Sequence, residues 1–233
     1  MQQLEPEDIA RLSRLLDRLE PVVGAMKRDG TAAIMTWEQL YAPLPADEQR
    51  FLDEFRALKA STLGATSHYF GELSGDPDLV AVGTQTLRTS FEPAELDPQY
   101  LPRPVLEAYQ RMMAAMEQDL GRRLLVESGY RSPAYQLYLF LFYLPSHSHS
   151  IVETNRFVAL PGHSEHGYPP RQAIDFINQD GISGENKPEA FETLPEYRWL
   201  QEHASTHGFV LSYPRNNAFN TAFEPWHWHY EPR

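Results

Sequence analysis

The sequence ends in a segment whose histidines and aromatic residues alternate. Residues 226–230 have two histidines between three aromatic residues. Because successive side chains of a strand point to opposite faces, this period of two predicts a strand with both histidines on one face. Glu224 stands three residues before His227, and the intervening Pro225 cannot donate to a strand ladder. We therefore expect Glu224 on a bend beside the strand, close to His227.

A second group of histidine and acid residues lies upstream, at His166 and Asp175. In residues 172–176, which we expect to form a strand, Ala173 shares a face with Asp175 and leaves room for its carboxylate. Together with His227, these residues offer two imidazoles and one carboxylate, and Glu224 remains as a base. That is the donor set of a catalytic zinc site whose fourth position is open to water. The sequence therefore predicts a zinc hydrolase.

Composition limits the partners that this chain can take. With 20 Lys and Arg against 32 Asp and Glu, its net charge is −12, which argues against nucleic acid or an anionic membrane surface as a partner. The absence of cysteine excludes disulfides and thiolate ligands. The most apolar run, residues 137–144, is far shorter than the roughly 20 residues of a membrane span.

The first 30 residues open with acids and have no apolar segment followed by a cleavage site. We therefore expect either a cytoplasmic chain as written, or a protein of the cell envelope or periplasm from which a leader has been removed.

The spacing of apolar residues predicts an α+β fold with a small, mostly antiparallel sheet flanked by helices. We expect a helix that stops at Pro21, a helix after Asp47, and a helix over residues 105–120 that Gly121 ends. Further elements are then expected in the rest of the chain: helices at 132–144 and 195–207, strands at 124–126, 156–160, 172–176, 209–213 and 226–230, and loops at 145–154 and 181–187. Residues 1–100 are predicted to be a helical extension packed on a core of residues 101–233 that carries the metal site.

Several motifs together resemble one known family. They are Ser128-Gly129-Tyr130-Arg131-Ser132 with Gln136, Pro161-Gly162-His163-Ser164-Glu165-His166, Ala173-x-Asp175, Gly208-Phe209-Val210-Leu211-Ser212-Tyr213-Pro214, and Glu224-Pro225-Trp226-His227. In the same order, they resemble the VanY-type D-alanyl-D-alanine carboxypeptidases, a family of zinc peptidases that trim bacterial cell-wall peptides. The resemblance covers about residues 105–230, somewhat over half of the chain.

This resemblance implies a role for each matching residue. It makes His166, Asp175 and His227 the ligands of Zn²⁺, and Glu224 the general base. It places Arg131 beside the reacting carbonyl, and it implies a peptidoglycan peptide as the substrate. The residues that it implies for substrate binding are Gln136 and Ser164, which would hold the terminal carboxylate, together with Ser128 and Tyr130.

The chain departs from the family pattern at three places, one of which is a longer loop at residues 146–150. The usual pattern is His-x-x-Gly-x-Ala-x-Asp. Here the loop between His166 and Asp175 is two residues longer, and Arg171 stands two residues before Ala173, where the pattern has its glycine. Ser212 stands where the family often has arginine. We expect the longer loop after His166 either to reshape the cleft or to shift His166, in which case His229 would compete for the metal.

Three functions remain open at this point. The first is a zinc carboxypeptidase that removes a C-terminal D-amino acid of the D-Ala-D-Ala type from peptidoglycan peptides. The second is an L,D-carboxypeptidase or endopeptidase with the same zinc site. The third is a non-catalytic module that binds cell-wall peptides. Retention of Glu224 argues against the third, because a structural zinc site has no use for a free base.

Overall fold

The computed structural model describes residues 2–63, 68–72, 78–88, 93–185, 187–218 and 221–232. Contacts divide the chain into two compact units that interleave in sequence. The first comprises Met1–Leu73, Arg131–Gly167 and Ala218–Ala222, and the second comprises Ser74–Tyr130, Tyr168–Asn217 and Phe223–Arg233. The division of the chain into a helical extension of residues 1–100 and a core of residues 101–233 stays a prediction.

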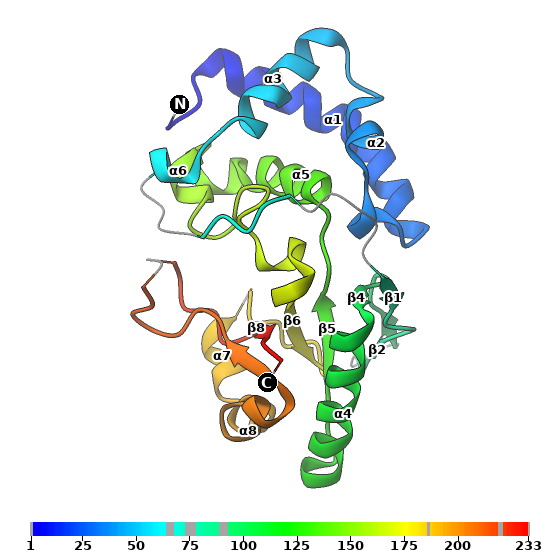
Figure 1. The fold of residues 1–233 in the computed structure, drawn as a ribbon. Coiled ribbons are helices and arrows are strands. Elements are labelled where there is room, and N and C mark those ends of the chain that lie inside the picture. The colour runs from blue at the N-terminus through cyan, green and yellow to red at the C-terminus, as the bar shows by residue number, and fades with distance from the viewer. Residues whose placement is uncertain are drawn as a thin grey trace. The chain divides into compact units, whose positions relative to one another are not determined.

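The first unit consists of helices around an apolar core (Figure 1). Its α-helices are α1 (Pro6–Arg28), α2 (Trp37–Tyr41), α3 (Ala46–Arg56), α5 (Pro133–Tyr143) and α6 (Ile151–Thr154). The predicted stop at Pro21 is wrong, since α1 continues to Arg28. A proline inside a helix costs about 3 kcal/mol. Burial of Val23 and Met26 beyond it offsets that cost, at roughly 1.5–3 kcal/mol for each side chain.

Helix α5 begins where the sequence predicts. Ser132 is its N-cap, and the Ser132 hydroxyl accepts a hydrogen bond of 3.1 Å from the backbone N–H of Tyr135. Two neighbouring predictions are wrong. Residues 145–154 form a short 3-10 helix (Pro145–His147) and α6 rather than a loop throughout. Residues 156–160 form turns instead of a strand, because the backbone N–H groups of Phe157 and Val158 both bond to Thr154.

The second unit is built on a four-stranded antiparallel sheet in the order β5-β6-β8-β7. The strands are β5 (Leu124–Ser128), β6 (Ala173–Asn178), β7 (Phe209–Leu211) and β8 (His227–Tyr230). Figure 1 shows α4 (Arg103–Leu120) alongside the sheet, and its buried methionines join the same apolar core as Val126 and Phe176. The predicted antiparallel sheet with flanking helices is confirmed.

Smaller elements complete the second unit. Strand β1 (Leu79–Ala81) pairs with β4 (Tyr100–Pro102), and β2 (Thr86–Leu87) pairs with β3 (Ala94–Glu95). Helices α7 (Pro188–Glu192) and α8 (Pro195–His203) contribute Phe191 and Leu200 to the core. Residues 181–187 lack helix and strand, as predicted, apart from a bridge at Ser183 and from residue 186, which lies outside the described residues.

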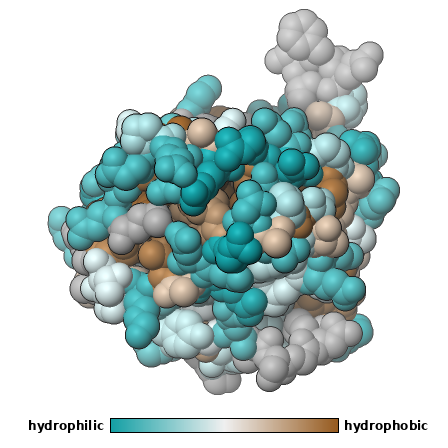
Figure 2. Space-filling model, turned by 90° about the horizontal axis from the view of Figure 1, so that it is seen from above, coloured by the Kyte–Doolittle hydropathy of each residue, from teal (hydrophilic) through white to brown (hydrophobic). Residues whose placement is uncertain are grey.

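The surface is mixed in character. Figure 2 shows hydrophilic side chains over most of the face that it draws, with apolar residues in separate patches between them. Among the described residues, no helix has both the length and the apolar character that crossing a bilayer requires.

Candidate metal centre

Asp175 and His227 face each other across neighbouring strands. The register of β6 and β8 pairs them directly, and Nδ1 of His227 lies 2.8 Å from Oδ1 of Asp175. Both side chains are largely buried. Ala173, two residues before Asp175, is fully buried and pairs with His229. The predicted sharing of one strand face by Ala173 and Asp175 therefore agrees with the observed register.

Glu224 lies in the turn that leads into β8, as the sequence predicts. Its backbone carbonyl accepts a 3.1 Å hydrogen bond from the N–H of His227, and its own N–H donates to the carbonyl of Tyr213 at 3.1 Å. The turn is also held by Trp228, whose indole N–H donates to the carbonyl of Pro225 at 2.9 Å. As a result, the Glu224 carboxylate lies beside the ring of His227, with Oε2 3.7 Å from Nδ1.

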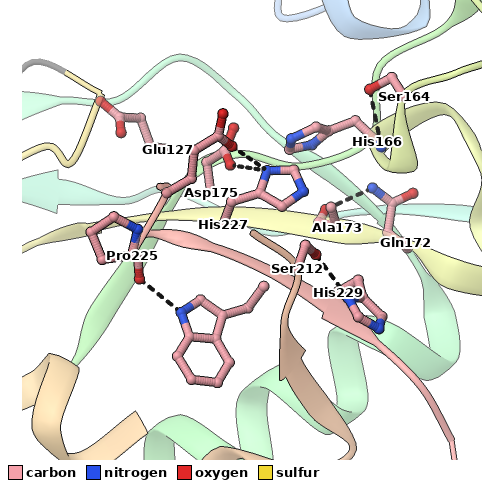
Figure 3. A network of polar contacts seen from close by, with 12 residues as sticks. Glu127, Ser164, His166, Gln172, Ala173, Asp175, Ser212, Pro225, His227 and His229 are labelled. Atoms are coloured by element: carbon pink, nitrogen blue, oxygen red, sulfur yellow. Dashed lines mark hydrogen bonds and ion pairs between the residues drawn. The ribbon is translucent and has the colours of Figure 1, made fainter. Parts of the chain in front are cut away.

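His166 lies in a 3-10 turn (Glu165–Gly167) and is buried. Its N–H donates to the hydroxyl of Ser164 at 3.3 Å, and its carbonyl accepts from the N–H of Arg131 at 3.0 Å. The potential ligand atoms of His166, Asp175 and His227 all lie within 4.8 Å of one another (Figure 3). The structure therefore groups the three residues that the sequence predicts as ligands.

The donor set fits zinc. Two imidazoles and one carboxylate leave a fourth tetrahedral position open, and this composition is typical of catalytic zinc sites. Nδ1 is the ring nitrogen of His227 that faces the carboxylate of Asp175, so it is the atom through which His227 would bind a cation. Glu224 is not part of the grouped ligand set.

The remaining predicted site residues have varied environments. Ser128 ends β5 and pairs with Asp175. Tyr130 is buried, and its N–H donates to the carbonyl of Tyr100 at 2.7 Å. Gln136 is also buried, and its amide donates to the carbonyl of Ala159 at 2.7 Å. That bond leaves the amide oxygen and one N–H of Gln136 for other partners.

Glu127 is an acidic residue of this region that the sequence analysis missed. It is the extra residue of a β-bulge, because Val126 pairs with Phe176 and Ser128 pairs with the next residue, Asp175. Burial raises the pKa of Glu127 to about 7; a hydrogen bond from Ser183 lowers it, while Asp175 and Glu185 raise it. The Ser183 hydroxyl donates to Oε2 at 2.9 Å. No sequence pattern marks this residue, since a bulge depends on the register of two strands.

Arg171 and Ser212, two of the departures from the family pattern, both contact His229. Nδ1 of His229 lies 2.8 Å from the hydroxyl of Ser212 and 3.4 Å from a guanidinium nitrogen of Arg171. Nε2 of the same ring lies 3.5 Å from the carboxylate of Glu231. His229 is almost fully buried in this network. Within the described part of the chain, the group suited to a metal contains His166, Asp175 and His227 and not His229; competition by His229 stays a prediction.

Comparison with known proteins shows similarity to one family of carboxypeptidases. The family model described as VanY, D-alanyl-D-alanine carboxypeptidase, matches residues 98–233. YodJ of Bacillus subtilis is 30% identical over 143 residues, which cover 60% of this chain and 50% of YodJ. A D-alanyl-D-alanine carboxypeptidase of Enterococcus faecalis is 38% identical over 80 residues, which cover 34% of this chain and 26% of that protein.

Among solved structures, the LdcB LD-carboxypeptidase is similar with a TM-score of 0.51 and 28% identity. The match covers 69% of this chain and 71% of that one. The chain belongs to the VanY D-alanyl-D-alanine carboxypeptidase family. It spans half or less of the curated relatives that it matches.

Proposed function

We propose that this protein is a zinc carboxypeptidase that removes the C-terminal D-amino acid from peptidoglycan peptides ending in D-Ala-D-Ala. The observation that carries the proposal is the grouping of His166, Asp175 and His227 with a separate carboxylate, Glu224, 3.7 Å from the ring of His227. A site that only stabilises the fold needs ligands but no additional base. Membership of the VanY family supports the same reaction.

When bound, zinc supplies Lewis-acid activation of the scissile carbonyl and of the attacking water. Glu224 is suited to take the proton of that water and to pass it to the leaving amine. Its backbone is fixed by hydrogen bonds to Tyr213 and His227, so only its side chain has to move. A general base of this kind contributes typically 10²–10⁴-fold to the rate.

Arg131 would act on the substrate rather than on the metal. Its N–H donates to the carbonyl of His166, which fixes its backbone next to a proposed ligand. A guanidinium offers a rigid fork of donors to a developing oxyanion or to a carboxylate. We assign the terminal carboxylate to Gln136 and Ser164, with Ser128 and Tyr130 at the end of β5 as further substrate-binding residues. Because this substrate is part of the cell wall, we also propose that the protein works in the cell envelope.

The test uses three synthetic peptides that share their first residues and differ only at the C-terminus. One ends in D-Ala-D-Ala, the second ends in a single D-Ala after an L-residue, and the third has an amidated D-Ala-D-Ala end. Released D-alanine and all shortened peptides are measured by mass spectrometry with zinc-loaded protein and with protein treated with a chelator. We expect zinc-dependent release from the first peptide alone. Release from the second peptide alone would replace this proposal with an L,D-carboxypeptidase, and cleavage inside the amidated peptide would indicate an endopeptidase.

A further inference from the structure

A cavity of about 270 Å³ lies at the outer edge of β5, within the second unit. Its wall comes from the segment around β2, from α4, from the start of β5 and from the residue after β6. The lining residues are Val82, Thr84, Gln85, Thr86, Tyr109, Gln110, Arg123, Leu125 and Gln179. Pockets for drug-sized ligands measure roughly 300–1,000 Å³, so this cavity suits a molecule of the size of an amino acid or a monosaccharide.

The cavity is separate from the metal centre. Leu125 pairs with Ile177 on β6, and Gln179 follows the end of that strand. Asp175 lies four residues before Gln179. At about 3.3 Å per residue, the lining begins about 7 Å along the strand from Asp175, at the level of Ile177, and extends beyond the end of β6.

Arg123 gives the cavity a positive charge. Among the described residues that line it, none carries a carboxylate, although acids outnumber bases in the whole chain. The neighbouring Arg122 lies within 4 Å of Asp180 and Glu196, whereas Arg123 has no such carboxylate within the described ranges. The guanidinium of Arg123 hydrogen-bonds to the hydroxyl of Tyr109, whereas its buried Nε has no hydrogen-bond partner among the same residues. A partly buried guanidinium without a counter-ion favours an anion, and its planar fork matches a carboxylate.

The wall is held in place by hydrogen bonds. The amide of Gln85 makes two bonds to the backbone of Val126, accepting from the N–H at 2.7 Å and donating to the carbonyl at 2.8 Å. The hydroxyl of Tyr109 donates to the carbonyl of Leu124 at 2.9 Å. Burial raises the pKa of Tyr109, which keeps the phenol neutral, and Arg123 lowers it. The backbone of Gln179 is fixed by the N–H of Arg88 at 2.6 Å. The cavity is therefore preformed.

Other lining groups determine what accompanies the carboxylate. The side-chain amides of Gln110 and Gln179 offer donors and acceptors for carbonyl or hydroxyl groups. Val82 and Leu125 offer an apolar wall. Within the described part of the lining, an ammonium group would find no acid to pair with, which disfavours a zwitterionic amino acid.

We propose that this cavity is a second binding site, specific for a small carboxylate that carries carbonyl or hydroxyl groups and no ammonium group. Two sources share this chemistry, namely an acylated amino acid and a sugar acid. Binding in this cavity does not involve the metal centre, so the proposal does not depend on the proposed peptidase activity.

The test is a titration of the zinc-loaded protein followed by backbone amide signals in NMR spectra. N-acetylglycine is compared with its neutral match N-acetylglycinamide and with glycine, and glucuronate is compared with glucose. We expect at least one of the two carboxylates to shift the amides of Gln85, Leu125 and Gln179, and the neutral matches and glycine to leave them unchanged. The carboxylate that binds more tightly identifies the source. Shifts confined to Asp175 and His227 would mean binding at the metal centre and would overturn the proposal.

Variants make the assignment specific. Arg123→Gln should raise the dissociation constant about tenfold or more, the usual loss for a hydrogen bond to a charged group. Arg111→Gln removes the same charge from an exposed position on α4 outside the lining and should change nothing. If Arg123→Gln fails to fold, Thr84→Trp is the second variant, because it fills an exposed part of the lining and keeps Arg123. Unchanged binding in either lining variant, or equal shifts by the neutral matches, would overturn the proposal.

Discussion

Nδ1 of His227 lies 2.8 Å from Oδ1 of Asp175, and these residues pair directly between β8 and β6. Each strand thus contributes one proposed ligand at the same level of the sheet, and the register fixes the separation of the two ligands. Because these two ligands are already close together, a metal ion has to rearrange them little when it binds.

The first prediction concerns the ligands. His227→Ala should remove most bound zinc, because only two of the three grouped donors remain. His166→Ala and Asp175→Ala should do the same, whereas His229→Ala should keep the metal. Zinc per chain is measured by elemental analysis after dialysis, with circular dichroism as a check of the fold. Full zinc content in His166→Ala together with an empty site in His229→Ala would reverse the assignment.

The second prediction concerns the base. Glu224→Gln keeps the size of the side chain and removes no grouped ligand, so zinc content and peptide binding should persist. Turnover should fall by about a hundredfold or more, because the amide cannot accept the proton of water. Steady-state kinetics and elemental analysis of the same sample check both statements. Undiminished turnover would assign the base to another residue.

The third prediction concerns Arg131. Arg131→Lys keeps the charge but loses the planar fork of donors, so kcat/KM should fall about tenfold or more. The matched control is Arg11→Lys, at a partly exposed residue of α1 that pairs with Glu7, and it should have wild-type kinetics. Wild-type kinetics in Arg131→Lys as well would remove Arg131 from the proposed mechanism.

The fourth prediction concerns pH and Glu127. Burial raises its pKa from 4.5 to about 7, so between these values the folded state holds a proton that the unfolded state has lost. The stability of the metal-free protein that comes from this residue is therefore complete below pH 4.5 and is lost as the pH rises through 7. Above pH 7, Glu127→Gln should be more stable than wild type by about 1–3 kcal/mol.

Chemical denaturation at several pH values checks this statement, with the chelator present throughout. Ser183→Ala is the matched variant: because the hydrogen bond from Ser183 lowers the pKa of Glu127, its removal should move the pH transition upward. A stability difference between wild type and Glu127→Gln that is the same at every pH would contradict the account.

Local sequence signals predicted a large part of this fold. Gly121 ends α4 in a left-handed conformation with φ of 64°, and Ser132 caps α5, as expected from the residue types at these positions. The predicted helix stop at Pro21 is wrong because the sequence shows only the local free-energy cost of a proline in a helix. The burial that offsets this cost comes from the packing of α1 against the core. Residues 156–160 have apolar residues but turn, since hydrogen bonds to Thr154 determine their backbone.

Some features of the site could be predicted from the sequence, and others depend on the pairing of strands. His166, Asp175 and His227 follow from motifs, and the bend at Glu224 follows from Pro225. The contact of Arg171 with His229 joins residues 58 positions apart, so it depends on the pairing of β6 with β8. The bulge that positions Glu127 likewise depends on strand register, which a single sequence does not reveal.

The most direct test of the central claim is mass spectrometry of muropeptides after incubation with the zinc-loaded protein. Pentapeptides that end in D-Ala-D-Ala should lose the mass of one alanine residue and accumulate as tetrapeptides. The same muropeptides should stay unchanged with Glu224→Gln. Pentapeptides left intact by the zinc-loaded wild type, or shortened equally by Glu224→Gln, would contradict the account.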